Sequence, residues 1–138
     1  MNKPARLRAA IMAALPDLAT NPERLSIFVE KGRLIATGVP GGGWDYAYTA
    51  TVLIQDFAGD MDDLAGAVIA WLHVEQPDLL LSADERERAI RFQCDLMDNE
   101  QADIALEIDL TEAVRANAAG GGYVHPPAPP SDPTADWL

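Results

Sequence analysis

The chain has 138 residues, enough for one domain with a proper hydrophobic core, and 49% of them are hydrophobic. Its formal net charge is −12, and residues 34–85 contain no Lys or Arg, which excludes a protein that grips a nucleic-acid backbone with that region. No apolar run approaches the roughly 20 residues of a membrane-spanning helix, and one cysteine excludes an internal disulfide.

The first third of the chain predicts one helix and two short strands. Leu7, Ile11 and Leu15 lie four residues apart, which predicts a helix over residues 3–15 that Pro16 ends. Residues 25–38 are typical of two β-strands, and Gly32 lies in a polar stretch between them. We therefore expect a tight hairpin at residues 30–33.

The middle of the chain has the clearest alternation. After a flexible loop at residues 40–43, alternate positions from 44 to 54 are apolar or aromatic, which predicts a long strand. A helix is expected after Gly59, with Asp60 as its N-cap, an apolar stripe from Met61 to Leu72, and Pro77 as its stop.

The next segment predicts a short helical turn and a second hairpin. Ser82 begins a capping-box pattern, and residues 90–96 and 104–110 both alternate. Cys94 shares the apolar face of the first of these strands, so we expect a buried thiol. The whole order predicts an α+β fold, with a mainly antiparallel or mixed sheet of about five strands and helices packed on one face.

The composition changes at residue 118. Residues 118–138 are rich in Gly and Pro and have no apolar periodicity, which predicts a C-terminal tail after a single domain at residues 1–117. Trp137 and Leu138 are unusual for a purely solvated segment. Their presence suggests that the tail contacts something.

No pattern in the chain indicates catalysis, a metal site or a cofactor. The glycines at 41–43 lack the Lys and Ser/Thr of a phosphate loop, and the chain's three serines lack a nucleophile-elbow setting. His73, His125 and Cys94 do not have metal-ligand spacing. Asp60, Asp62 and Asp63 could hold a hard cation, but helix-start carboxylates are common and capping is the favoured interpretation.

Several segments resemble a known family. They are MNKPARLRAA at the start, NPERLSIFVEKGRLIAT at 21–37, DFAGD at 56–60, AWLHVEQPDLL at 70–80, RFQCDLMDNEQADIALEIDLTEAV at 91–114, and the closing DWL. In order and spacing these segments resemble the tail completion protein R family of P2-type contractile bacteriophages. The resemblance covers nearly the whole predicted domain.

The resemblance implies a non-catalytic structural protein of the virion. On this interpretation the chain has a fold like that of phage tail terminators and closes into a homohexameric ring. The ring caps the tube and sheath at the head-proximal end of a contractile tail and enables head–tail joining. The implied partners are the tail tube protein, the tail sheath protein and a neck protein. DNA passes through without specific binding, no membrane is involved, and assembly takes place in the host cytoplasm.

Candidate contact residues follow from this interpretation. The candidate interface residues are the N-terminal cations Lys3, Arg6 and Arg8, the loop and aromatic-row residues Gly42, Gly43, Trp44 and Tyr46, and the tail residues Pro127, Pro130, Trp137 and Leu138. An acidic lumen would keep DNA from sticking, and its candidate residues are Asp45, Asp60, Asp62 and Asp63.

Two other functions compete with this interpretation. The first is a monomeric adaptor whose polyproline segment at residues 126–130 is read by a partner domain. The second is a small metal-assisted hydrolase that uses Asp60, Asp62 and Asp63. The aromatic row beginning at Trp44 is likewise either core or a set of binding anchors.

Overall fold

The computed structural model describes residues 1–96 and 100–127. In chain order its elements are α1 (Lys3–Ala14), α2 (Pro16–Thr20), the 3-10 turn η1 (Pro22–Arg24), β1 (Leu25–Ala36), β2 (Trp44–Phe57), α3 (Met61–Glu75), the 3-10 turn η2 (Pro77–Leu80), α4 (Ala83–Arg88), β3 (Ile90–Leu96), β4 (Ala102–Ala116) and β5 (Tyr123–Val124).

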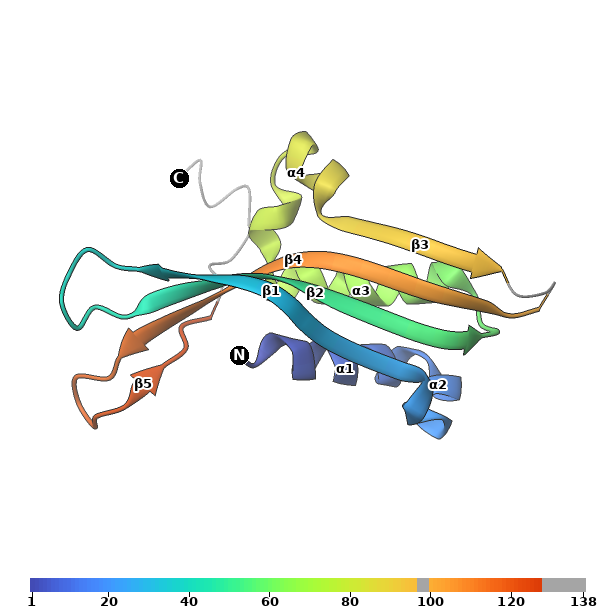
Figure 1. Ribbon diagram of the computed structural model, residues 1–138, viewed down its shortest axis with the longest axis horizontal. Helices are drawn as coiled ribbons and strands as arrows, with labels where there is room; N and C mark the ends of the chain where they lie inside the picture. Colours follow the sequence, from blue (N-terminus) through green and yellow to red (C-terminus); the bar gives the residue numbers. More distant parts are fainter. Residues whose placement is uncertain (97–99, 128–138) are drawn as a thin grey trace.

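The strands form one antiparallel sheet in the order β1-β2-β4-β3, and β5 pairs with the end of β4. Helices α1 and α3 contact each other and lie against one face of this sheet, whereas no helix of the described residues covers the other face (Figure 1). The predicted α+β fold, with a mainly antiparallel sheet and helices on one face, is confirmed. None of the helices in residues 1–96 and 100–127 is long and apolar enough to cross a bilayer.

The core lies between the two central strands and the two long helices. Alternate residues of β2 and β4 face the helices and are buried from Tyr48 to Ile54 and from Ala102 to Leu110. Leu7 and Ile11 of α1 and Leu64 and Leu72 of α3 close the core from the other side and are fully buried. Each such side chain contributes about 1.5–3 kcal/mol to stability.

The helix boundaries follow the predicted signals. The Asp60 carboxylate accepts a hydrogen bond from the Asp62 backbone N–H at 2.8 Å and caps α3. Ser82 caps α4 by accepting from the Glu85 N–H at 3.1 Å. Pro77 follows the end of α3, and Pro16 both follows α1 and begins α2.

The hairpin predicted at residues 30–33 is wrong. β1 runs through these residues as one strand, and its register on β2 shifts between Val29 and Gly32. Two β1 residues there oppose one residue of β2, which is the geometry of a β-bulge. A Cβ on Gly32 would lie 3.1 Å from the Cβ of Tyr48, so the glycine permits close contact between the strands.

The prediction of a buried Cys94 is also wrong, because its thiol is exposed. Cys94 does lie on the helix-facing side of β3, opposite Ile104. However, β3 is an edge strand and its residues after Ile90 are all exposed. Its neighbours Phe92 and Leu96 are 64% and 79% exposed for the same reason.

The sheet extends beyond its helices at one end. We call this extension the β-arm: residues 31–36 of β1, 44–46 of β2, 113–116 of β4, and β5. In Figure 1 it forms the left-hand part of the molecule, where the β1–β2 loop and the β4–β5 hairpin project past the N-terminus of α1. Strand β5 lies in the segment predicted to be a tail, and its pairing with Arg115 and Ala116 was not anticipated from the sequence.

Candidate functional site

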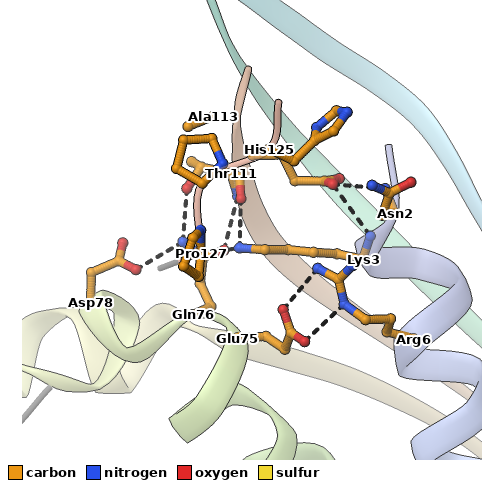
Figure 2. A pocket seen from close by; sticks show the side chains of 12 residues that line it. Asn2, Lys3, Arg6, Glu75, Gln76, Asp78, Thr111, Ala113, His125 and Pro127 are labelled. Atoms are coloured by element: carbon orange, nitrogen blue, oxygen red, sulfur yellow. Dashed lines mark hydrogen bonds and ion pairs between the residues drawn. The ribbon is translucent and has the colours of Figure 1, made fainter. Parts of the chain in front are cut away.

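A polar pocket lies where the β-arm meets the helices. Its volume is about 460 Å³, and it lies between the start of α1, the end of α3 and the middle of β4 (Figure 2). The lining residues are Asn2, Lys3, Arg6, Glu75, Gln76, Asp78, Thr111, Glu112, Ala113, His125, Pro126 and Pro127.

Glu112 is the centre of a buried hydrogen-bond network beside this pocket. Its side chain is on β4 and only 6% of the residue is exposed. One carboxylate oxygen accepts from the Tyr48 hydroxyl at 2.6 Å, and the other accepts from the backbone N–H groups of Asn2 at 2.7 Å and Lys3 at 3.4 Å. The carboxylate therefore fixes the start of α1 to the sheet.

The charges of this network are perturbed by burial. Burial acts to raise the pKa of Glu112, but the hydrogen bonds from Tyr48, Asn2 and Lys3 outweigh it and hold the pKa below its usual value. Burial and the hydrogen bond to Glu112 raise the pKa of Tyr48. Burial is also the largest effect on Lys3 and lowers its pKa, although nearby carboxylates oppose that change.

Lys3 and Gln76 connect the helices to β4. The Lys3 ammonium donates to Oε1 of Gln76 at 2.6 Å and to the Thr111 carbonyl at 2.7 Å. Gln76 is 2% exposed; its amide donates to Asp78 at 2.9 Å and to the Thr111 hydroxyl at 2.8 Å. These bonds satisfy polar groups that would be costly to leave buried and unpaired.

The other two N-terminal cations also make contacts within the chain. Arg6 donates two hydrogen bonds to Glu75, at 2.8 and 2.9 Å, and so joins α1 to α3. Arg8 donates to the carbonyls of Leu25 at 2.6 Å and Pro22 at 3.0 Å. The interface role predicted for Lys3, Arg6 and Arg8 remains a prediction, but each of them has a structural role in a single copy.

The β-arm presents aromatic and aliphatic side chains. The ring of Trp44 packs edge-on against Tyr46 at 6.1 Å and against Tyr123 at 5.1 Å between ring centroids. Leu34, Ile35, Val39, Tyr123 and Val124 are exposed around them. A single copy therefore leaves much of the β-arm's apolar surface in water, which is typical of a binding surface.

The glycine loop beside Trp44 has a strict backbone requirement. Gly43 has a φ of 90°, and a Cβ there would lie 2.1 Å from the Val114 carbonyl oxygen. A Cβ on Gly42 would lie 2.4 Å from the Thr37 hydroxyl. These two predicted interface residues thus shape the loop that leads into β2, and partner contact remains a prediction for both.

A second exposed apolar surface lies on the helix-facing side of β3. A groove of about 230 Å³ there is lined mainly by Phe57, Met61, Phe92, Cys94 and Leu96. The residues of β3 that point to the opposite face are polar, and Arg91 there is bonded to Asp109 at 3.0 Å and lies 3.6 Å from Glu107. The edge strand is thus apolar on one face and polar on the other.

The four predicted lumen residues do not form one patch. Asp45 is in the β-arm and pairs with Arg115 at 3.0 Å. Asp60, Asp62 and Asp63 begin α3, just after the far end of β2. A strand rises about 3.3 Å per residue, so roughly 40 Å separates Asp45 from Phe57 at that end.

The tail residues are only partly within the described structure. Pro127 lines the polar pocket near Lys3. The predicted interface residues Pro130, Trp137 and Leu138 lie outside the described residues. The domain boundary predicted at residue 117 remains a prediction, although β5 places residues 123 and 124 against the sheet.

The exposed apolar surfaces of the β-arm and of β3 are suited to binding, and the polar contacts around Glu112 have a structural role. Across the described residues, no group of three or more His, Cys, Asp or Glu side chains is placed to hold a metal ion. At Asp60, Asp62 and Asp63 the sequence favoured helix capping over a cation site, and in the structure the Asp60 side chain caps α3.

Comparison with known proteins identifies the family. The model of the P2 phage tail completion protein R family matches residues 1–129. The chain belongs to this family. It is also 33% identical to the tail completion protein R of Escherichia phage P2, over 97% of this chain and 89% of that protein. No solved structure matches the chain.

Family membership confirms the resemblance and gives the chain a structural role in phage tail completion. It also implies association with a virion and with other tail components. The sequence had not indicated Tyr48, Gln76 or Glu112 as parts of a polar network. Only Glu112 gave a signal, because it is a carboxylate at an apolar position of the β4 alternation.

Proposed function

We propose that six copies of this chain close into a ring that caps the tail tube and sheath of a contractile tail and enables head–tail joining. The observation that carries this proposal is the pair of exposed apolar surfaces, the β-arm and the β3 groove, on different parts of one small domain. A head-to-tail contact needs two different patches, and repeating that contact closes a ring when its rotation permits.

Shape also supports a ring component. The β-arm projects beyond the helices (Figure 1). It can therefore contact a neighbouring copy while the core between the helices and the sheet stays intact. The network around Glu112 lies at the junction and holds the start of α1 to the sheet. A rigid junction lets the β-arm bind without first paying a large cost of ordering.

We further infer that the ring has an acidic lumen, which repels the phosphates of passing DNA. Asp60, Asp62 and Asp63 are the stronger candidates for this surface. They cluster at one helix start, whereas the charge of Asp45 is offset by Arg115. The neck protein, the tube protein and the sheath protein are the proposed partners, and the head–tail junction is the proposed location.

Mass measurement and electron microscopy test the proposal. Native mass measurement of the purified chain, alone and mixed with tail tube protein, should find six copies associated with the tube. A solitary copy with no tube binding would instead favour the adaptor hypothesis. Tails from phage lacking this gene product should be abnormal in length and should fail to join heads. Normal tails that still join heads would contradict the proposal.

A further inference from the structure

We propose that neighbouring copies join by continuing the sheet: residues 31–36 of β1 in one copy pair with β3 (Ile90–Leu96) of the next. This inference rests on the proposed ring and names its subunit contact. β1 and β3 are the two outer strands in the order β1-β2-β4-β3, so within residues 1–96 and 100–127 no strand lies on the outer side of either. Unpaired strand edges are templates for pairing with another chain.

The β-arm half of β1 is the more exposed half of this edge strand. At the start of β1, Arg8 donates to the Leu25 carbonyl at 2.6 Å and so covers that end of the edge. The bulge between Val29 and Gly32 then separates that end of β1 from the β-arm half. The β-arm half and the seven-residue β3 are each about 20 Å long, so their lengths match.

The faces of the two strands also match. Copies in a ring are related by rotation, so each presents the same face of its sheet outward. If the sheet continues from one copy to the next, the helix-facing side chains of both copies therefore lie on the same side. On that face Leu34 lies opposite Tyr46, and Cys94 lies opposite Ile104. Leu34 is 70% exposed and would cover the apolar groove around Cys94.

The charges on the two strand edges are complementary, which favours a second copy of this chain as the partner. Residues 31–44 contain Lys31 and Arg33 and no carboxylate, in a chain with a net charge of −12. Arg33 lies on the helix-free face of β1, opposite Ala47, and Asp95 lies on the same face of β3, opposite Asp103. In an antiparallel pairing that places Leu34 opposite Cys94, Arg33 lies opposite Asp95. This pairing reduces the repulsion between two acidic copies.

Disulfide trapping tests the contact directly, because Cys94 is the chain's single cysteine and is exposed. Under oxidation, Leu34→Cys should give a ladder of linked copies ending at six, since a disulfide requires Cβ atoms about 4 Å apart. Leu34→Cys with Cys94→Ser leaves no thiol opposite position 34 in the proposed contact, so it should give no ladder. Val74→Cys, on the exposed face of α3 with Cys94 retained, is the matched control and should give no ladder.

Charge reversal gives an independent readout. Arg33→Glu and Asp95→Arg should each raise the concentration at which the ring dissociates by about tenfold, and the double variant should restore it. Both side chains are exposed, so the thermal unfolding of each variant should match that of the wild type at concentrations where both are dissociated.

The two proposals fail in different ways. A six-copy ring that gives no ladder and ignores both charge reversals would overturn this contact and leave the ring intact. In that case Lys31 and Arg33 only guard the strand edge against aggregation. Solitary copies that do not bind tube protein would overturn both the contact and the proposed function.

Discussion

Removing the Glu112 carboxylate should be among the most destabilising polar changes in this chain. Glu112→Ala leaves three donors without their acceptor: the Tyr48 hydroxyl and the N–H groups of Asn2 and Lys3. Each buried donor left unpaired costs about 1–3 kcal/mol, and the Asn2 N–H is only partly buried. We therefore expect a loss of about 3–5 kcal/mol in the free energy of unfolding.

Urea unfolding followed by tryptophan fluorescence and far-UV circular dichroism measures this loss. Glu107→Ala is the matched control, because Glu107 is on the same strand with its side chain 55% exposed, and should cost less than about 0.5 kcal/mol. Tyr48→Phe removes one donor only and should cost about 1 kcal/mol. If Glu112→Ala cost no more than Glu107→Ala, the network would not hold α1 to the sheet.

The same carboxylate predicts a pH dependence. The pKa of Glu112 is lowered below 4.5 in the folded state, so its contribution is fully present above about pH 4.5 and is lost as pH falls through the folded pKa. The difference in stability between the wild type and Glu112→Gln should therefore shrink as pH falls from 4.5 toward about 3. If this difference stayed constant over this range, the pKa of Glu112 would not be lowered in the folded state.

Three further substitutions test the fold around the surfaces by urea unfolding. Gly43→Ala should cost about 1–3 kcal/mol, because φ is 90° and the new Cβ would clash with a carbonyl oxygen, whereas Gly38→Ala has open space and should be near neutral. Asp60→Ala should lower the free energy of unfolding by about 1 kcal/mol, because it removes the α3 cap. Asp60→Asn should retain most of the stability that the cap provides. Leu72→Ala should cost about 2–5 kcal/mol, since Leu72 is fully buried, while the exposed Val74→Ala should change little. Equal effects within a pair would contradict the stated cause.

Much of the fold could be predicted because local signals and long-range packing agree. The alternation in β2 and β4 reports which side chains face the helices, and Asp60 and Pro77 mark the ends of α3. The error at residues 30–33 has a local cause. A glycine within a polar stretch occurs both in turns and in β-bulges. Here β1 forms a bulge because it pairs with the long strand β2 on both sides of that stretch.

The candidate site could be predicted less well, because it is assembled from distant segments. The network joins Lys3, Tyr48, Gln76 and Glu112, and the hydrogen bonds between them span up to 109 residues of sequence. From the sequence, Lys3 reads as an exposed interface cation, yet the structure buries it. Alternation also could not show that Cys94 would be uncovered, since a period of two gives the face of a strand and not what lies over it.

The uncovered β-arm follows from the different rises of strands and helices. A strand rises about 3.3 Å per residue and a helix 1.5 Å, so the 14 residues of β2 span about 46 Å and the 15 residues of α3 only about 22 Å. Helices of this length can cover only about half of the sheet. The row that begins at Trp44 continues the core pattern beyond that cover, so its apolar side chains must be covered by one another or by another chain. Trp44 packs against Tyr123, so these two rings partly cover each other. Leu34 and Val39 remain exposed, and we expect another chain to cover them.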